Sequence, residues 1–90
     1  MAVVEKSGER GRLRWKCRRG MLELDLVLLP FLDHHYEGLS DQKKIIFERL
    51  LEEQDPVLQS WFMHQVVPQD NELAAMVDYI RAMLQHGKRS

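Results

Sequence analysis

Ninety residues make one small domain with room for a single hydrophobic core. Hydrophobic residues make up 44% of the chain and charged residues 30%, a balance that fits a globular protein and excludes a disordered tail. The net charge of −1 favours neither nucleic acid nor an anionic membrane as a partner, and the one cysteine excludes an internal disulfide and indicates a reducing compartment such as the cytoplasm.

The ends of the chain carry no targeting signal that we can read. Residues 1–9 have no long apolar segment, so we expect a flexible N-terminus rather than a signal peptide. The longest apolar run, residues 26–32, contains Pro30 and is too short to span a bilayer. We therefore expect one helical domain over residues 10–86, followed by a flexible C-terminus over residues 87–90.

The first predicted helix covers residues 10–19 and is basic, with Leu13 and Trp15 as its main apolar residues. Gly20 follows it directly. Because glycine reaches left-handed backbone conformations at little steric cost, Gly20 predicts a helix cap or a tight corner.

The second predicted helix covers residues 21–37. Its apolar residues surround most of its circumference, which is typical of a helix buried at the centre of a bundle. We expect Pro30 to kink this helix, because proline removes one backbone donor. The apolar residues are Met21, Leu22, Leu24, Leu26, Val27, Leu28, Leu29, Phe31 and Leu32.

Two further helices are predicted from their start signals. Ser40 is a suitable N-cap for a third helix that continues to Gln54, with an apolar stripe along it. An N-cap at Asp55 and a proline at Pro56 start a fourth, short helix. The apolar residues of these two helices are Ile45, Ile46, Phe47, Leu50, Leu51, Val57, Leu58, Trp61 and Phe62.

The last predicted helix begins after Pro68, with Asp70 or Asn71 as its cap. Its apolar residues recur at helical spacing and form one stripe. These residues are Leu73, Met76, Val77, Ile80 and Leu84. The fold class that follows is all-α, a small five-helix bundle.

Residues typical of catalysis or metal binding are few. His34 and His35 are adjacent, so on a helix they point about 100° apart and cannot share one metal ion. Cys17 has no readable base beside it and is expected to be a buried structural thiol. We therefore expect neither a catalytic residue nor a metal site, and no enzyme.

The basic first helix could follow a phosphate backbone. Its six basic residues are interleaved with one aromatic ring, Trp15, which is not a stacking platform, and acidic residues lie close by. An ordinary solvated helix face is therefore favoured over nucleic-acid binding.

Opposite charges gather at the corner between the first two helices, around Arg18, Arg19, Gly20, Glu23 and Asp25. One interpretation is a local ion pair between Arg19 and Glu23, which are spaced i,i+4, but an exposed pair of this kind adds only about 0.2–1 kcal/mol. The other is a binding surface, on which a guanidinium and a carboxylate flank a glycine that a partner can approach closely. The residues alone leave both interpretations open.

The segment Arg19-Gly20-Met21-Leu22-Glu23 resembles the Arg-Gly-x-x-Glu motif of the succinate dehydrogenase FAD assembly factor family. The similarity spans roughly residues 10–84. It includes Trp15-Lys16-Cys17-Arg18-Arg19-Gly20-Met21, Glu23-Leu24-Asp25, Pro30-Phe31, Leu50-Leu51-Glu52, Asp55-Pro56 and Leu58-Gln59-Ser60-Trp61.

The resemblance implies a five-helix protein that assists covalent attachment of FAD to the flavoprotein subunit of succinate dehydrogenase, and in bacteria to that of fumarate reductase. FAD would be the cofactor of the partner, with none bound stably by this chain, since no glycine-rich phosphate loop follows a strand. The residues that would contact the partner are Trp15, Arg18, Arg19, Gly20, Glu23 and Asp25. Without a mitochondrial presequence, the chain resembles a bacterial, cytoplasmic member. The alternative is a helical interaction module with another partner, such as an antitoxin-like protein or a membrane-associated regulator.

Overall fold

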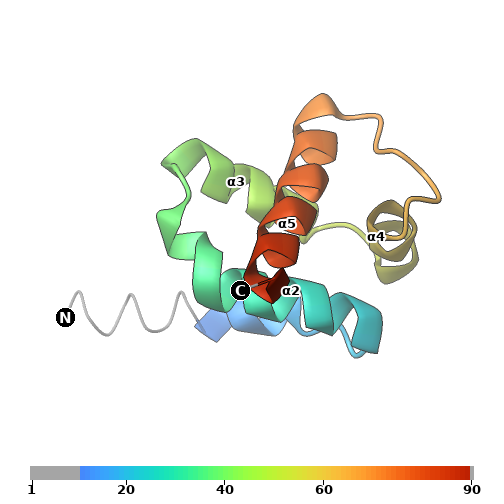
Figure 1. Ribbon diagram of the computed structural model, residues 1–90. Helices are drawn as coiled ribbons and strands as arrows, with labels where there is room; N and C mark the ends of the chain where they lie inside the picture. Colours follow the sequence, from blue (N-terminus) through green and yellow to red (C-terminus); the bar gives the residue numbers. More distant parts are fainter. Residues whose placement is uncertain (1–10, 90) are drawn as a thin grey trace.

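Helices follow one another through residues 11–89, the part of the chain that the computed structural model describes, with side chains described as far as residue 85. Residues 11–17 are helical, and they are followed by α2 (Leu22–His35), a short 3-10 helix η1 (Tyr36–Gly38), α3 (Asp41–Leu50), α4 (Asp55–Phe62) and α5 (Asn71–Arg89) (Figure 1). No strand occurs between residues 11 and 89. The prediction of an all-α bundle is confirmed.

The long helix α5 holds the bundle together. It crosses α2 steeply and packs against α3 and α4, which lie on either side of it in Figure 1. Of its predicted stripe, Leu73, Met76, Val77 and Ile80 are buried, while Leu84 is half-buried and packs against the core. The helix continues to Arg89, three residues beyond the predicted end of the domain at residue 86, while the predicted N-terminal segment 1–9 lies outside the described residues.

The helix α2 is less buried than its composition predicts. Leu24, Leu28, Phe31 and Leu32 point into the core. Leu22 is 70% exposed and Leu26 is 62% exposed, so the prediction of burial on all sides is wrong. Only one face of α2 packs against the bundle, and the positions spaced by four from Leu22 face outward. The chain therefore keeps apolar side chains on its surface at the start of this helix.

The predicted N-caps of α3 and α5 are confirmed. Ser40 Oγ accepts a hydrogen bond from the backbone N–H of Lys43 at 3.2 Å. Asp70 Oδ1 accepts from the backbone N–H groups of Glu72 and Leu73 at 2.8 and 3.1 Å, and its other carboxylate oxygen pairs with Arg49 at 2.7 Å. The hydrogen bond from Arg49 and those from the two backbone N–H groups hold the pKa of Asp70 below its ordinary value.

The boundary between α3 and α4 differs from its prediction. The helix α3 ends at Leu50 rather than Gln54, and α4 begins at Asp55 with Gln54 as its N-cap. Residues 51–53 form a turn. The carbonyl groups of Leu51 and Glu53 in this turn accept hydrogen bonds from the side chain of Arg19. These bonds take the place of the backbone hydrogen bonds that the two carbonyl groups would accept in a longer helix.

None of the helices within residues 11–89 is long and apolar enough to cross a lipid bilayer.

Candidate functional site

The corner between residues 11–17 and α2 turns on Gly20. Its φ is +79°, a left-handed backbone conformation that residues with a β-carbon disfavour. The prediction of a left-handed corner at Gly20 is therefore confirmed. Gly20 is exposed, and apart from Gly20 itself and its two neighbours in the chain no described residue has an atom within 4 Å of the position that a β-carbon would occupy. Another molecule can therefore reach the backbone at this corner.

The side chain of Arg19 is turned into the molecule. Its Nε donates to Asp55 Oδ1 at 2.7 Å, and its Nη1 donates to the carbonyl oxygens of Lys16 and Leu51 at 2.7 and 3.0 Å. Its Nη2 donates to the carbonyl oxygen of Glu53. The guanidinium thus ties the end of the first helix to the turn after α3 and to the start of α4.

This position bears on both interpretations of the Arg19 and Glu23 pair. Arg19 forms its ion pair with Asp55, and within residues 11–85 no ion pair joins it to Glu23. Its side chain is only 13% exposed, and four of its hydrogen bonds go to groups of its own chain. Arg19 is therefore placed to hold the corner, and the surface around Gly20 is made by its neighbours.

Asp25 also acts within the corner. Its Oδ1 accepts a hydrogen bond from the backbone N–H of Arg19 at 2.8 Å, which links the first turn of α2 back to the residue before Gly20. The side chain of Asp25 is half-buried. Arg19 and Asp25 together fix the backbone on both sides of the glycine.

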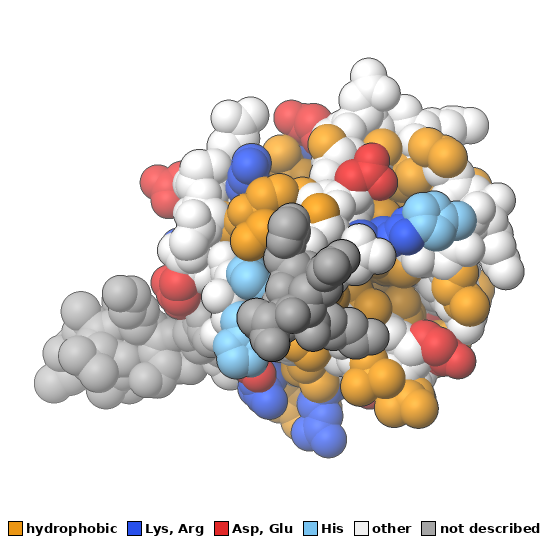
Figure 2. Space-filling view, in the orientation of Figure 1, with side chains coloured by type: hydrophobic (Ala, Val, Ile, Leu, Met, Phe, Trp, Pro, Cys, Tyr) orange, Lys and Arg blue, Asp and Glu red, His pale blue; other side chains and the backbone are white. Residues whose placement is uncertain are grey.

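The other predicted contact residues face solvent. Arg18 and Glu23 are exposed beside Gly20, and Trp15 is 75% exposed on the preceding helix. The exposed side chain of Leu22 lies next to Glu23 in the sequence and adds apolar surface. In Figure 2, hydrophobic and acidic side chains lie together over the N-terminal end of α2, at the lower right of the view. A rigid corner thus carries two charges, a bare glycine backbone and large apolar groups.

The remaining candidates form no chemical centre within the described residues. Cys17 is fully buried in the core, in agreement with its predicted structural role. His34 is exposed and His35 half-buried at the end of α2, and no group of three or more histidine, cysteine, aspartate or glutamate side chains in the described part of the chain could hold a metal ion. The side chain of His86 lies outside the described residues.

A single protein-family model spans this corner and the helices around it. Residues 11–84 match a family described as "Flavinator of succinate dehydrogenase". The chain belongs to this flavinator family. The match covers all the helices described above except the last five residues of α5, and it confirms the resemblance that the Arg19 to Glu23 segment indicates.

Curated relatives in the flavinator family are similar over most of the chain. A Shewanella oneidensis protein named FAD assembly factor SdhE is 58% identical over 71 residues, which cover 78% of this chain and 85% of that protein. The Colwellia psychrerythraea protein of the same name is 54% identical over 71 residues, covering 79% of this chain and 78% of its own length. The protein of that name from Yersinia pseudotuberculosis is 48% identical over 73 residues, covering 81% of this chain and 83% of its own length.

Sequence reasoning missed two features of the corner and of α2. Asp55 was interpreted only as a helix start, although its carboxylate is the ion-pair partner of Arg19, 36 residues earlier. No short-range signal reveals that pairing. The other missed feature is the exposure of Leu22 and Leu26, which depends on the side of α2 that the other helices cover and which hydrophobicity alone does not reveal.

Proposed function

We propose that this chain binds the flavoprotein subunit of succinate dehydrogenase, and also that of fumarate reductase, and promotes the covalent attachment of FAD. The observation that carries the proposal is the exposed corner of Gly20 and Glu23, held by Arg19 and Asp25, in a member of the flavinator family. The same corner supports binding through its mixture of exposed groups. Glu23 can accept hydrogen bonds from the partner, Arg18 can donate them, and Trp15 can bury apolar area.

The contribution of the chain to flavin attachment is positional in this proposal. The bond forms between a histidine of the flavoprotein and the flavin methyl group, and the docked corner holds the domains of the flavoprotein where these two groups meet. Holding two reacting groups in the right geometry can by itself remove a large part of a reaction barrier. The chain then needs no catalytic residue and no FAD of its own, and it would act in the cytoplasm, where the flavoprotein is assembled.

Glu23→Ala tests the proposal most directly. Purified flavoprotein lacking covalent flavin is incubated with FAD, with and without this chain, and covalent FAD is read as fluorescence in a denaturing gel. We expect the wild-type chain to raise that fluorescence, and Glu23→Ala to leave it near the level without the chain. Because Glu23 is exposed, the unfolding free energy of the variant should change by no more than about 0.5 kcal/mol beyond the helix-dipole effect.

Asp41→Ala is a matched control, because Asp41 is also an exposed carboxylate in the first turn of a helix. We expect this variant to support FAD attachment as the wild type does. No rise in covalent FAD with the wild-type chain would refute the proposed function. A Glu23→Ala variant that unfolds easily, yet still assists while folded, would show that the carboxylate is structural.

A further inference from the structure

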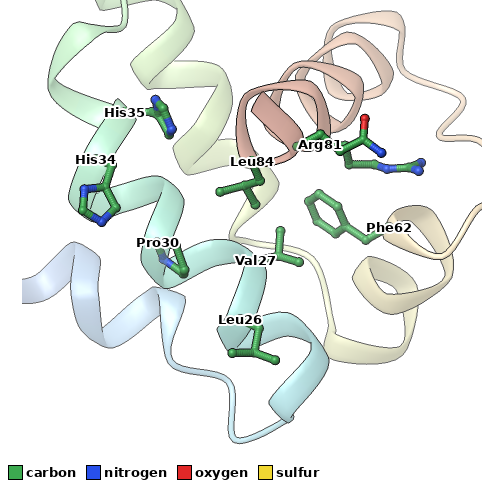
Figure 3. A pocket seen from close by; sticks show the side chains of 9 residues that line it. Leu26, Val27, Pro30, His34, His35, Phe62, Arg81 and Leu84 are labelled. Atoms are coloured by element: carbon green, nitrogen blue, oxygen red, sulfur yellow. The ribbon is translucent and has the colours of Figure 1, made fainter. Parts of the chain in front are cut away.

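An apolar groove lies beyond the corner, between α2, α4 and α5. Its volume is about 680 Å³. Figure 3 shows Val27, Phe62 and Leu84 pointing toward one another from the three helices, with Leu26 near one end and His34 near the other. Leu26 is 62% exposed, so the groove opens onto the surface at that end.

The groove is continuous with the corner along one face of α2. Leu22, Leu26, Pro30 and His34 follow at intervals of four, so they form one stripe on the helix. Leu22 is exposed beside Glu23, and Leu26 is the next member of the stripe and the first residue of the groove. A partner that docks at the corner therefore meets an apolar path that leads into the groove.

The charges of the groove favour an acidic occupant. Arg81 is half-buried at its edge, and its Nη1 lies 2.8 Å from His64 Nδ1. Asp78 and Arg81 both line a second, smaller hollow, but no ion pair joins the two. Within residues 11–85 no carboxylate pairs with this guanidinium. The charged or titratable residues that line the groove are Arg81, His34 and His35. A guanidinium has five N–H donors and binds a carboxylate in a fork, so most of its donors are available to a visiting acid.

We infer that this groove is a second part of the docking surface, and that it receives an apolar segment of the flavoprotein whose aspartate or glutamate pairs with Arg81. The inference rests on the proposed function for the identity of the partner. The apolar side chains of that segment fill the space between Val27, Phe62 and Leu84, and the acid fixes its register along α2.

The test compares three variants of the full chain in direct binding to the flavoprotein, measured by calorimetry. Leu26→Asp and Arg81→Glu should each raise the dissociation constant about tenfold or more, equivalent to about 1.4 kcal/mol. Ile45→Asp is the matched control, since Ile45 is 61% exposed on α3, away from the groove. Its dissociation constant should stay within about twofold of the wild-type value. Arg81→Glu should also weaken the salt dependence of binding, because it removes the attractive pair.

The outcomes separate this inference from the proposed function. If the wild type binds the flavoprotein and both groove variants bind equally well, the groove inference is overturned and the proposed function stands. If the wild type does not bind, both are overturned. A wild-type dimer that Leu26→Asp dissociates would show that a second copy occupies the groove. A fall of several degrees in the melting temperature of the isolated Leu26→Asp protein would show that the chain itself fills the groove. Dissociation of a dimer or such a fall in melting temperature would each overturn the inference.

Discussion

Arg19→Ala should destabilise the fold far more than a surface substitution does. The guanidinium makes four hydrogen bonds, three to carbonyl groups and one to Asp55, and its side chain is 13% exposed. Removing one partner of a buried ion pair costs about 3–5 kcal/mol. Because the side chain of Asp55 is 33% exposed and water can reach it after the change, we take the lower end, about 3 kcal/mol.

This loss is large enough to measure without unfolding the protein at room temperature. Domains of this size have unfolding free energies of about 5–15 kcal/mol. In a domain of 60–100 residues, each kcal/mol shifts the melting temperature by about 4–8 °C, so Arg19→Ala should melt roughly 12–24 °C below the wild type. Thermal unfolding followed by circular dichroism measures the shift. Arg18→Ala is the matched control, since its neighbouring guanidinium is exposed and its loss should change stability by no more than about 0.5 kcal/mol.

The same variant separates a positioning role from direct contact with the partner. We expect Arg19→Ala to lose part of its support for FAD attachment at temperatures where it is folded, because the corner is less rigid. A melting temperature within about 4 °C of the wild type would refute the stabilising role of the Arg19 side chain, since this shift corresponds to less than about 1 kcal/mol. If stability were unchanged and FAD attachment were lost, Arg19 would have to act on the partner itself.

Two other perturbations follow from the described geometry. Gly20→Ala and Gly20→Arg should each cost about 1–2 kcal/mol in stability, because both force a residue with a β-carbon into a left-handed conformation. Only Gly20→Arg should block docking to the flavoprotein. Equal binding of the flavoprotein by the two variants would contradict the close approach of the partner to Gly20. Asp70→Asn should keep the N-cap of α5 but lose the ion pair with Arg49, so it should melt below the wild type at neutral pH. Because the pKa of Asp70 is lowered in the folded state, the difference in melting temperature should be fully present above the ordinary pKa of 3.8 and disappear as the pH falls through the lower folded-state pKa. A difference in melting temperature that is constant with pH would contradict this prediction.

Features that depend on neighbouring residues could be predicted from the sequence. The N-caps at Ser40 and Asp70 and the left-handed Gly20 need only a few adjacent residues, and the structure confirms all three. The stripe of α5 follows from helical periodicity alone. The family could be identified from a short motif supported by its wider context.

Features that depend on distant parts of the chain could not be predicted. The pairing of Arg19 with Asp55 joins residues 36 positions apart, and the carbonyl groups of Leu51 and Glu53, in the turn after α3, bond to the same guanidinium. The exposure of Leu26 depends on which side of α2 the other helices cover. Hydrophobicity alone does not distinguish a leucine that packs in the core from one that meets another protein.

The buried thiol of Cys17 can serve as a built-in probe of opening at the corner. It is the one cysteine in the sequence, it has no exposed area, and it lies two residues before Arg19. An alkylating reagent can therefore reach it only when the structure around the corner opens. The rate of alkylation, followed by mass with and without a bound flavoprotein, would measure how often the corner opens and how strongly docking keeps it closed, without any added label.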